Sequence, residues 1–302
     1  MKILSLFDGM ACGALAFKRA DVPIERYVAY EIDKYATKVA SHNFPMIEQR
    51  GDVFKADFTE FEGFDAVIGG SPCTYWSIAR GNSNSNNDGV ARETVASGLG
   101  WDLFSQYVRA LREVKPRYFL YENNQSMSDE IKECISNELG CEPHEIDSAD
   151  FSAQIRKRYY WTNIPLGKLP DESPLVLKDI MEKSVDEKYF YKKDFEILDM
   201  SKRVCAELKV NSMEMNRRIY NPDFKCCTLT CINGGYHEKK VLDSGRPRKL
   251  TEVEYERLQG LPDNFTKVQL NSRWLSYSKR CSLMGNGWNE PTVEWILSGL
   301  NS

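Results

Sequence analysis

The chain has 302 residues, of which 42% are hydrophobic and 28% charged, and its formal net charge at pH 7 is −4. This composition is ordinary for a globular protein, and the apolar runs are too short to cross a bilayer. The nine cysteines have no regular paired spacing, which favours a reducing compartment over a disulfide framework. Because the first residues carry no signal-peptide pattern, we expect a cytoplasmic protein without a membrane partner.

The charge is distributed unevenly along the chain. Residues 201–250 contain eleven Lys or Arg and five Asp or Glu, a net +6, so the remainder carries −10. A basic face on an acidic body suits a protein that holds a phosphate backbone on one side. On charge alone, a solvated basic surface without a partner is an equal alternative.

The N-terminal segment predicts three strand ends around a common pocket. Residues 2–7 form a strand pattern, a glycine-bearing turn follows, and the helical pattern begins at Ala14. A second strand over 27–30 ends at Glu31, and Asp52 lies at the tip of a third. Glycine lets a ligand approach backbone N–H groups, and an acidic residue after the second strand commonly binds a ribose. The strand ends therefore predict a nucleoside pocket, with a plain tight turn and capping carboxylates as the alternatives.

A cysteine follows the central strand of the predicted sheet. Residues 66–68 form a short apolar run typical of a buried parallel strand, and residues 69–72, Gly-Gly-Ser-Pro, stop it. Cys73 therefore stands beyond the carboxyl end of a strand, where open α/β sheets bind ligands. A thiol in this position can act as a nucleophile, whereas an isolated half-buried cysteine is more often structural.

A long polar segment and a further strand follow Cys73. Residues 79–100 are rich in Asn, Ser and Gly, and such a segment next to a nucleophile predicts an active-site lid. A helix over 102–114 has one apolar face, and a buried strand over 118–121 follows it and ends in Glu122-Asn123-Asn124. We expect the Glu122 carboxyl group to lie beside the Cys73 thiol as an acid partner.

Gln154, Arg156 and Arg158 occupy alternate positions in the sequence. On a strand, this alternation places all three side chains on one face, so that three hydrogen-bond donors converge on one spot. The alternative is an exposed edge strand that carries charges.

In this order, the motifs resemble those of the C5-cytosine DNA methyltransferases over nearly the whole chain. Pro72-Cys73 matches the nucleophile motif, Glu122-Asn123 the glutamate motif, and Gln154-x-Arg156-x-Arg158 the paired-arginine motif. Residues 248–251, Glu254 and residues 257–262 match the motif that closes the recognition domain. Gly285-Asn286 matches the last motif, which returns to the cofactor. The resemblance implies an α/β fold: a Rossmann-like, doubly wound, mostly parallel sheet with a smaller target-recognition domain.

The resemblance also implies a reaction. A target cytosine leaves the duplex, because its C5 and C6 are inaccessible while it is stacked, and Cys73 attacks C6. Glu122 would bind N3 and the exocyclic amine, Arg158 would hold O2, and Arg156 and Gln154 would orient the catalytic loop and backbone. C5 would then take the methyl group of S-adenosyl-L-methionine, while the loop 74–98 closes over the base.

The binding residues implied by the resemblance fall into two sets. The residues expected to bind S-adenosyl-L-methionine are Phe7, Asp8, Gly9, Met10, Gly13, Ala14, Leu15, Glu31, Ile32, Asp52, Val53, Ser71, Pro72, Leu103, Asn286 and Trp288. The residues expected to contact DNA are Ser77, Arg80, Arg217, Arg218, Thr228, Thr230, Gly234 and Gly235. Arg218 is the expected base reader, because arginine can bind guanine O6 and N7 bidentately.

The family's domain order implies a catalytic domain over 1–165 and 251–302 and a target-recognition domain over 166–250, which contains the +6 segment. We expect no metal. A zinc site at Cys226, Cys227, Cys231 and His237 is the alternative, although this spacing fits no standard finger.

Two positions depart from the family pattern. Asn124 stands where the family usually has valine, and Gly287-Trp288 where it usually has Ser-Val. One explanation for both differences is neutral drift with local repacking of the neighbouring side chains. The alternative is a pocket reshaped for a modified S-adenosylmethionine, from which a group such as carboxymethyl would be transferred, with Asn124 as an added amide donor.

Two further classes compete with a DNA methyltransferase. An RNA cytosine methyltransferase of the same fold is disfavoured because the Cys-Phe-Thr element of the tRNA-modifying branch is absent. An inactive DNA-binding regulator is disfavoured because Cys73, Glu122 and both arginines are present. We expect a monomer that binds double-stranded DNA in a bacterial cell or a phage-infected host, and a cognate restriction enzyme stays open as a partner.

Overall fold

The computed structural model describes residues 1–78, 92–232 and 234–301, which divide into two compact units. The first unit comprises residues Met1–Ile146, Lys157–Gly167 and Val293–Ser302, and the second Asp147–Arg156 and Lys168–Thr292. Residues 251–292, expected in the catalytic domain, thus belong to the second compact unit. The assignment of functions to the two expected domains stays a prediction.

A seven-stranded sheet, in the order β3-β2-β1-β4-β5-β7-β6, is the framework of the first unit. Neighbouring strands from β3 to β5 pair in parallel, whereas β7 is antiparallel to β5. The α/β fold with a mostly parallel sheet is therefore confirmed. The strands are β1 (Lys2–Leu6), β2 (Arg26–Tyr30), β3 (Glu48–Gln49), β4 (Ala66–Gly69), β5 (Tyr118–Asn124), β6 (His144–Asp147) and β7 (Lys157–Thr162).

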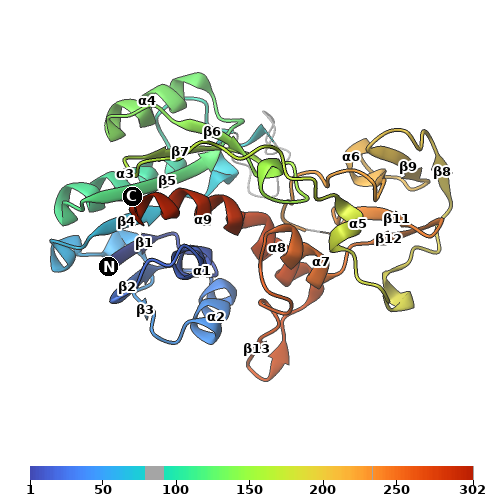
Figure 1. The fold of residues 1–302 in the computed structure, drawn as a ribbon, viewed down its shortest axis with the longest axis horizontal. Coiled ribbons are helices and arrows are strands. Elements are labelled where there is room, and N and C mark those ends of the chain that lie inside the picture. The colour runs from blue at the N-terminus through green and yellow to red at the C-terminus, as the bar shows by residue number, and fades with distance from the viewer. Residues whose placement is uncertain (79–91, 233, 302) are drawn as a thin grey trace. The chain divides into compact units, whose positions relative to one another are not determined.

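The connections between these strands run in two directions from β1 and β4. The chain steps from β1 to β2 and β3 on one side, and from β4 to β5 on the other. Because parallel crossovers are right-handed, the helices after β1 and β2 cover one face and the helix between β4 and β5 covers the other (Figure 1). The helices are α1 (Cys12–Arg19), α2 (Lys34–Asn43), α3 (Leu99–Val114), α4 (Asp129–Leu139) and α9 (Glu290–Ser298), with short 3₁₀ turns η1 (Val53–Lys55), η2 (Phe58–Phe61), η3 (Cys73–Tyr75) and η7 (Gly299–Asn301).

Aromatic side chains fill the core between α3, β5 and β7. The Tyr121 ring lies 4.8 Å from that of Tyr107, 5.1 Å from Phe104 and 5.8 Å from Trp161, measured between centroids. All four side chains are fully buried. Because these rings come from three different elements, their packing fixes β5 against α3 and β7.

The sequence predicted most of these elements, with a shift at the end of the third strand. The helix over 34–43 is confirmed, with Asp33 as its N-cap. The third strand ends at Gln49, and Asp52 instead caps η1. The strand expected to end in Glu122-Asn123-Asn124 is confirmed as β5, and pairing with β7 supplies hydrogen-bond partners for its last residues.

The second unit contains a smaller sheet in the order β12-β11-β10-β9-β8 and a two-stranded hairpin. Its strands are β8 (Phe195–Ile197), β9 (Val204–Leu208), β10 (Arg218–Tyr220), β11 (Lys240–Asp243), β12 (Arg246–Lys249), β13 (Gln269–Leu270) and β14 (Arg273–Trp274). Its helices and 3₁₀ turns are η5 (Ser148–Asp150), α5 (Leu177–Ile180), η6 (Glu187–Tyr189), α6 (Glu214–Arg217), α7 (Glu252–Leu258) and α8 (Tyr277–Asn286).

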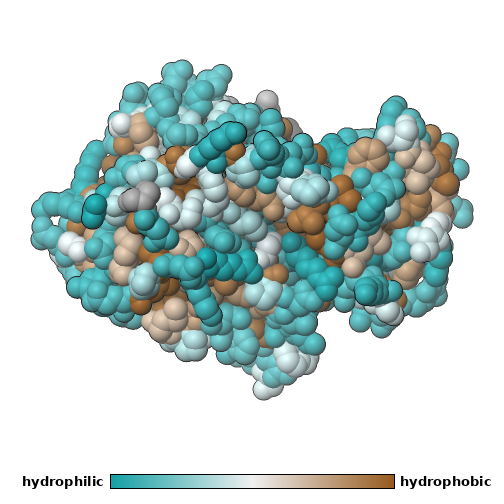
Figure 2. All heavy atoms as spheres, in the orientation of Figure 1, coloured by the Kyte–Doolittle hydropathy of each residue, from teal (hydrophilic) through white to brown (hydrophobic). Residues whose placement is uncertain are grey.

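Figure 2 shows one face of the molecule. This face is covered largely by hydrophilic residues, with hydrophobic ones in smaller groups. Across the described residues, no helix has the length and apolar character needed to span a membrane.

A buried ion pair joins β12 to α7 in the second unit. The Arg248 guanidinium donates from Nη1 and Nη2 to the two Glu254 carboxylate oxygens, each at 2.7 Å, and from Nε to Asp243 at 2.7 Å. The side chains of Arg248 and Glu254 are both fully buried. Glu254 also accepts from the Thr251 backbone N–H and so completes a capping box. The motif at 248–254 therefore has a structural role, because it connects β12 to α7 through buried side chains.

Replacing Glu254 with Gln should lower the free energy of unfolding by roughly 3 kcal/mol, because the buried Arg248 loses the carboxylate that binds it bidentately. The matched control is Glu187→Gln, which removes the exposed partner of Arg246 on the same strand and should change stability little. Urea denaturation followed by circular dichroism measures both variants. Equal losses would contradict a special role for the buried pair.

Candidate active site

Cys73 lies beyond the end of β4, in the turn η3, where its side chain is half-buried. The strand ends at a glycine for a steric reason: a Cβ on Gly69 would lie 2.7 Å from the Leu6 carbonyl oxygen. The chain leaves the sheet through Ser71 and Pro72. The prediction that a rigid turn presents Cys73 at the carboxyl edge of the sheet is confirmed.

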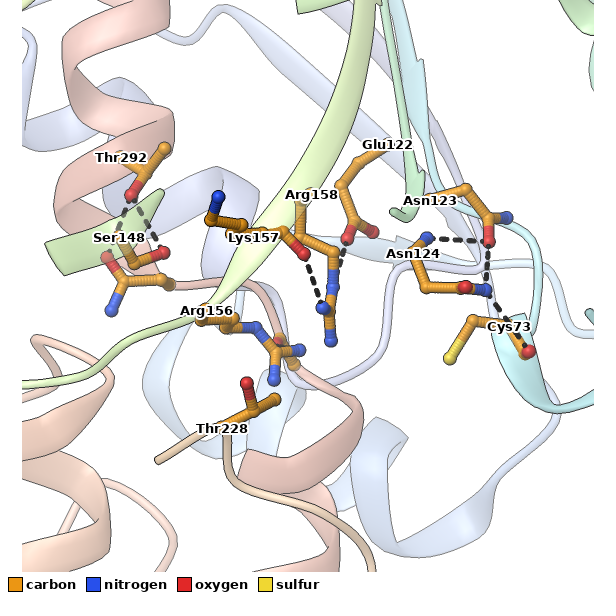
Figure 3. A network of polar contacts seen from close by, with 12 residues as sticks. Cys73, Glu122, Asn123, Asn124, Ser148, Arg156, Lys157, Arg158, Thr228 and Thr292 are labelled. Atoms are coloured by element: carbon orange, nitrogen blue, oxygen red, sulfur yellow. Dashed lines mark hydrogen bonds and ion pairs between the residues drawn. The ribbon is translucent and has the colours of Figure 1, made fainter. Parts of the chain in front are cut away.

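Glu122 and Arg158 form an ion pair between β5, which is next to β4, and β7 on the far side of β5. The antiparallel register pairs Glu122 with Tyr160 and Asn124 with Arg158. Arg158 Nε lies 3.0 Å from Glu122 Oε1, and each side chain is only 12% exposed. Figure 3 shows the Cys73 sulfur pointing to the side on which Glu122 and Arg158 lie. A thiol and a carboxylate–guanidinium pair thus lie at one edge of the sheet.

A second polar network supports the turn that carries Cys73, and sequence reasoning missed it. The amide of Asn123 donates to the Ser71 carbonyl at 3.1 Å and to the Tyr121 hydroxyl at 3.1 Å. The hydroxyls of Tyr121 and Ser71 lie 2.6 Å apart. Burial raises the pKa of Tyr121 well above its usual value, so the hydroxyl stays protonated. The available signal was the polar run of Asn123 and Asn124 at the end of an apolar strand.

The expectation that Gln154, Arg156 and Arg158 share one strand is wrong, because β7 begins at Lys157. Gln154 and Arg156 precede it and belong to the second unit. The Gln154 amide donates to Leu258 O and Gln259 Oε1, and its oxygen accepts from the Leu229 N–H at 3.0 Å.

Arg156 joins two segments of the second unit. It donates to Leu229 O at 3.2 Å, to Gly285 O at 3.3 Å and to Gly287 O at 2.9 Å. A Cβ on Gly285 would lie 2.5 Å from the Thr230 carbonyl carbon, so this glycine allows the segments to approach closely. In the structure, Gln154 and Arg156 therefore hold backbone segments of their own unit.

The turn after β1 has the backbone geometry expected of a ligand-binding loop. Phe7, Gly9 and Ala11 have φ values of 58°, 60° and 64°. Glu31 stabilises this turn, because its Oε2 accepts from the Gly9 N–H at 2.8 Å and its Oε1 from the N–H groups of Ile32 and Asp33. The N–H groups of Asp8 and Ala11 donate to Tyr30 O and Asp8 O, so these bonds and the one from Gly9 hold the turn in this conformation.

The other residues expected at the cofactor are spread over both units. Met10, Ala14 and Leu15 are buried with Gly13 in or just before α1, Leu103 is half-buried on α3, and Ile32 is 78% exposed. Val53 is buried in η1 after the capping residue Asp52. Asn286 and Trp288 lie in the second unit, where Asn286 Oδ1 accepts from the Cys231 thiol at 2.9 Å. Their role at the cofactor stays a prediction.

Asp8 is a buried carboxylate in the turn after β1. Its Oδ1 accepts from Ser5 Oγ at 2.6 Å and from the Tyr27 hydroxyl at 2.7 Å. Its Oδ2 is buried and has no hydrogen-bond partner among the described residues. Burial raises the pKa of Asp8 to about 6, although the hydrogen bonds from Ser5 and Tyr27 oppose the shift. A buried oxygen without a hydrogen-bond partner suits a cationic or hydrogen-bond-donating ligand.

The residues expected to contact DNA differ in their present contacts. Arg218, the expected base reader, forms a bidentate pair with Glu214 at 2.8 and 2.6 Å, and Arg217 lies 3.4 Å from Glu207. Thr228 donates to Ile155 O, and Thr230 accepts from Lys239 Nζ at 3.3 Å. Gly234 and Gly235 are exposed with positive φ, Ser77 follows η3, and Arg80 lies outside the described residues.

Within the described part of the chain, no group of three or more His, Cys, Asp or Glu side chains is arranged to hold a metal ion. The side chains of the alternative zinc site, Cys226, Cys227, Cys231 and His237, therefore do not form a metal-binding cluster.

Comparison with protein families gives one match that spans the chain. The family described as C-5 cytosine-specific DNA methylase matches residues 1–300. The chain is 27% identical to the type II methyltransferase M1.ScrFI of Lactococcus lactis subsp. cremoris, over 87% of this chain and 70% of that protein. It is 29% identical to the orphan methyltransferase M.Rho11sI of Bacillus phage rho11s, over 93% of this chain and 53% of that protein. The chain thus spans about half the length of the phage relative.

Solved structures share the fold. The S. pombe Dnmt2 methyltransferase aligns with a TM-score of 0.69 at 18% identity, over 99% of this chain and 97% of that one. The Entamoeba histolytica methyltransferase EhMeth also gives 0.69, at 17% identity, with the same coverage.

The unusual Asp8 pKa gives a prediction for stability. The folded-state pKa of about 6 exceeds the ordinary 3.8, so ionisation of Asp8 costs folding free energy above pH 6, and this cost disappears as the pH falls toward 4. Asp8→Asn has no group to titrate there. We expect its stability advantage over the unmodified protein to shrink by roughly 2 kcal/mol between pH 7.5 and pH 4.5. Urea unfolding of both proteins at the two pH values measures this, and a constant difference would contradict it.

Proposed function

The chain belongs to the C-5 cytosine-specific DNA methylase family, and we propose that it methylates C5 of cytosine in DNA with Cys73 as its nucleophile. One observation carries the assignment of residues. The thiol of Cys73, the carboxylate of Glu122 and the guanidinium of Arg158 lie at the same edge of one sheet (Figure 3). This edge is where open α/β sheets bind their substrates.

Cys73 acts first in the proposed mechanism. The target cytosine must leave the duplex, because C6 is inaccessible to a thiolate in stacked DNA. The Cys73 sulfur then forms a bond to C6, the C5–C6 double bond opens, and electron density moves toward C5 and N3. Pro72 and η3 hold the nucleophile on a short turn that has little freedom to move.

Glu122 and Arg158 bind the ring on which this charge develops. Glu122 protonates or hydrogen-bonds N3 and accepts from the exocyclic amine, and Arg158 donates to O2. Their ion pair at 3.0 Å, with both side chains 12% exposed, holds the two groups in a fixed relation before the base arrives. After transfer, loss of the C5 proton restores the double bond and expels Cys73.

The turn after β1 suits the methyl donor. S-adenosylmethionine, when bound, supplies a methyl group made electrophilic by its sulfonium centre. Asp8 Oδ2, a buried acceptor without a partner among the described residues, would accept a hydrogen bond from it. Glu31 accepts from the Gly9 N–H, and in this proposal it also accepts from the ribose hydroxyls. Asp52 and Val53 follow on the adjoining turn.

The basic segment 201–250 lies in the second unit, and we infer that it recognises DNA. Arg218 would exchange its pair with Glu214 for a base edge, since both guanidinium contacts are to an exposed carboxylate. Thr228 and Thr230 would position the backbone. We further infer a monomer that acts on DNA in the cytoplasm.

The transferred group is an unmodified methyl in this proposal. The alternative required Asn124 to offer an amide donor to a carboxylated cofactor. Its Nδ2 instead donates to Cys73 O at 3.4 Å and to Asn123 Oδ1 at 3.1 Å, so both amide hydrogens have acceptors within the protein. Mass spectrometry of the modified nucleosides distinguishes the two products.

A covalent trap tests the nucleophile. In DNA with 5-fluorocytosine in place of cytosine, the fluorine on C5 cannot leave as a proton does, so the adduct with Cys73 should persist through denaturing electrophoresis. Cys73→Ser should abolish both the adduct and 5-methylcytosine formation while DNA binding is retained. Cys134→Ser, at another half-buried cysteine of the first unit, is the matched control and should behave as the unmodified protein. An adduct retained in Cys73→Ser would falsify the assignment.

Glu122 can be tested separately from the nucleophile. Glu122→Gln keeps the side-chain volume but removes the acid, so kcat should fall roughly 10²- to 10⁴-fold with little change in DNA affinity. Glu133→Gln on the exposed face of α4 is the control and should leave kcat unchanged. Single-turnover methyl transfer and a filter-binding assay supply the two measurements. A loss confined to DNA affinity would contradict a role in chemistry.

A further inference from the structure

The backbone of Cys73 is held by more than its own turn. Its carbonyl oxygen accepts from the N–H groups of Trp76 at 3.1 Å and Ser77 at 3.0 Å, which close η3. It also accepts from Asn124 Nδ2 at 3.4 Å, a contact from a strand 51 residues away in sequence. Figure 3 shows this contact from β5 to the nucleophile. Asn124 thus connects the nucleophile turn to the strand that carries the acid.

The side chain of Asn124 has little freedom to move. It is 4% exposed, and its Nδ2 donates to Asn123 Oδ1 at 3.1 Å in addition to Cys73. Its Oδ1 accepts from the Ser126 hydroxyl at 2.8 Å. Since both amide hydrogens and the oxygen are engaged, the rotamer is fixed.

Asn124 also stands in a particular register with the acid. Side chains two residues apart on a strand point to the same face, so Asn124 and Glu122 share one face of β5. A shift of β5 that moves the Glu122 carboxylate therefore also moves the Asn124 amide, which is bonded to Cys73 O, in the same direction. This arrangement keeps the nucleophile and the acid in a constant relation.

The network continues from Asn124 to the segments on either side of residues 79–91. Ser126 Oγ accepts from the Ile78 N–H at 3.4 Å, and Ser126 O accepts from Arg92 Nη2 at 2.6 Å. Arg92 Nε donates to Trp76 O at 3.0 Å. The turn that begins at Cys73 is thereby held at its first carbonyl by Asn124 and near its end by Arg92.

We propose that Asn124 is a positioning residue for this reaction, which holds Cys73 against β5 so that its sulfur keeps a fixed place relative to Glu122. The inference rests on the proposed function, because it assumes that Cys73 is the nucleophile. Asn124 itself does not touch the reacting atoms through its amide, whose donors are already used. Its effect should therefore appear in the rate of the chemical step and leave the binding of both substrates unchanged.

The test compares three variants in single-turnover methylation. Asn124→Ala removes the contact, Asn124→Val substitutes the residue that is usual in the family, and Asn124→Asp keeps the volume and the oxygen that accepts from Ser126. We expect kcat to fall about 10- to 100-fold in all three, with KM for DNA and the Kd for S-adenosylmethionine unchanged, because a small misplacement of a nucleophile costs this much. Formation of the 5-fluorocytosine adduct should slow by the same factor.

The matched control is Asn163→Ala. Asn163 also joins backbone groups by its amide, donating to Arg117 O at 2.8 Å and accepting from the Phe119 N–H at 2.8 Å, but at the opposite end of the β5–β7 pair. It should affect thermal stability and leave kcat unchanged. The proposal would be overturned if kcat in the Asp and Val variants stayed within threefold of that of the unmodified protein. A loss seen only in KM, or an equal loss of kcat in Asn163→Ala, would overturn it as well. Failure of the proposed function is distinguishable, since the unmodified protein would then form no adduct.

Discussion

The site depends on how β5 is held between its neighbours. Tyr121 packs against Phe104, Tyr107 and Trp161, so rings from α3 and β7 fix one face of the strand. The next residues use this fixed position: Glu122 pairs with Arg158, and the amide of Asn123 reaches the Ser71 carbonyl before Pro72. Because the aromatic core stabilises the strand, the polar side chains at its end need little further ordering to reach their partners. The packing of the aromatic core thus determines where Glu122 and Asn123 are placed.

Much of this arrangement could be predicted from the sequence. A short apolar run ended by two glycines and a proline predicted β4 and the position of Cys73 beyond its carboxyl end, and a second apolar run followed by Glu122 predicted the neighbouring acid. The antiparallel pairing of β5 with β7 could not be predicted, because the residues of a strand do not specify its neighbour in the sheet. The spacing of Gln154, Arg156 and Arg158 likewise suggested one strand, whereas β7 begins at Lys157, since local periodicity carries no information about where a pairing partner begins.

Buried charged side chains differ between the two units in how fully their hydrogen bonds are satisfied. In the second unit, Arg248 and Glu254 are fully buried and satisfy each other, so neither can serve a ligand. In the first unit, Asp8 is buried with one oxygen satisfied and the other without a partner among the described residues, at the cost of a raised pKa. Glu122 and Arg158 lie between these cases: they are paired, yet each keeps some exposure. A buried charge that is incompletely satisfied or accessible is a signal of function, and both instances fall at carboxyl ends of strands in the same sheet.

Asn124 shows how a departure from a family pattern can be read physically. Valine at this position would bury its side chain without any polar cost, so an asparagine that is 4% exposed is tolerated only because its amide is satisfied. The partners that satisfy it are the Cys73 carbonyl, the Asn123 amide oxygen and the Ser126 hydroxyl, all of which lie next to the nucleophile. A polar side chain that merely replaced valine by chance could have found partners on either side of β5. Because its contacts instead join the two segments that must act together, positioning of the nucleophile explains this residue better than repacking alone.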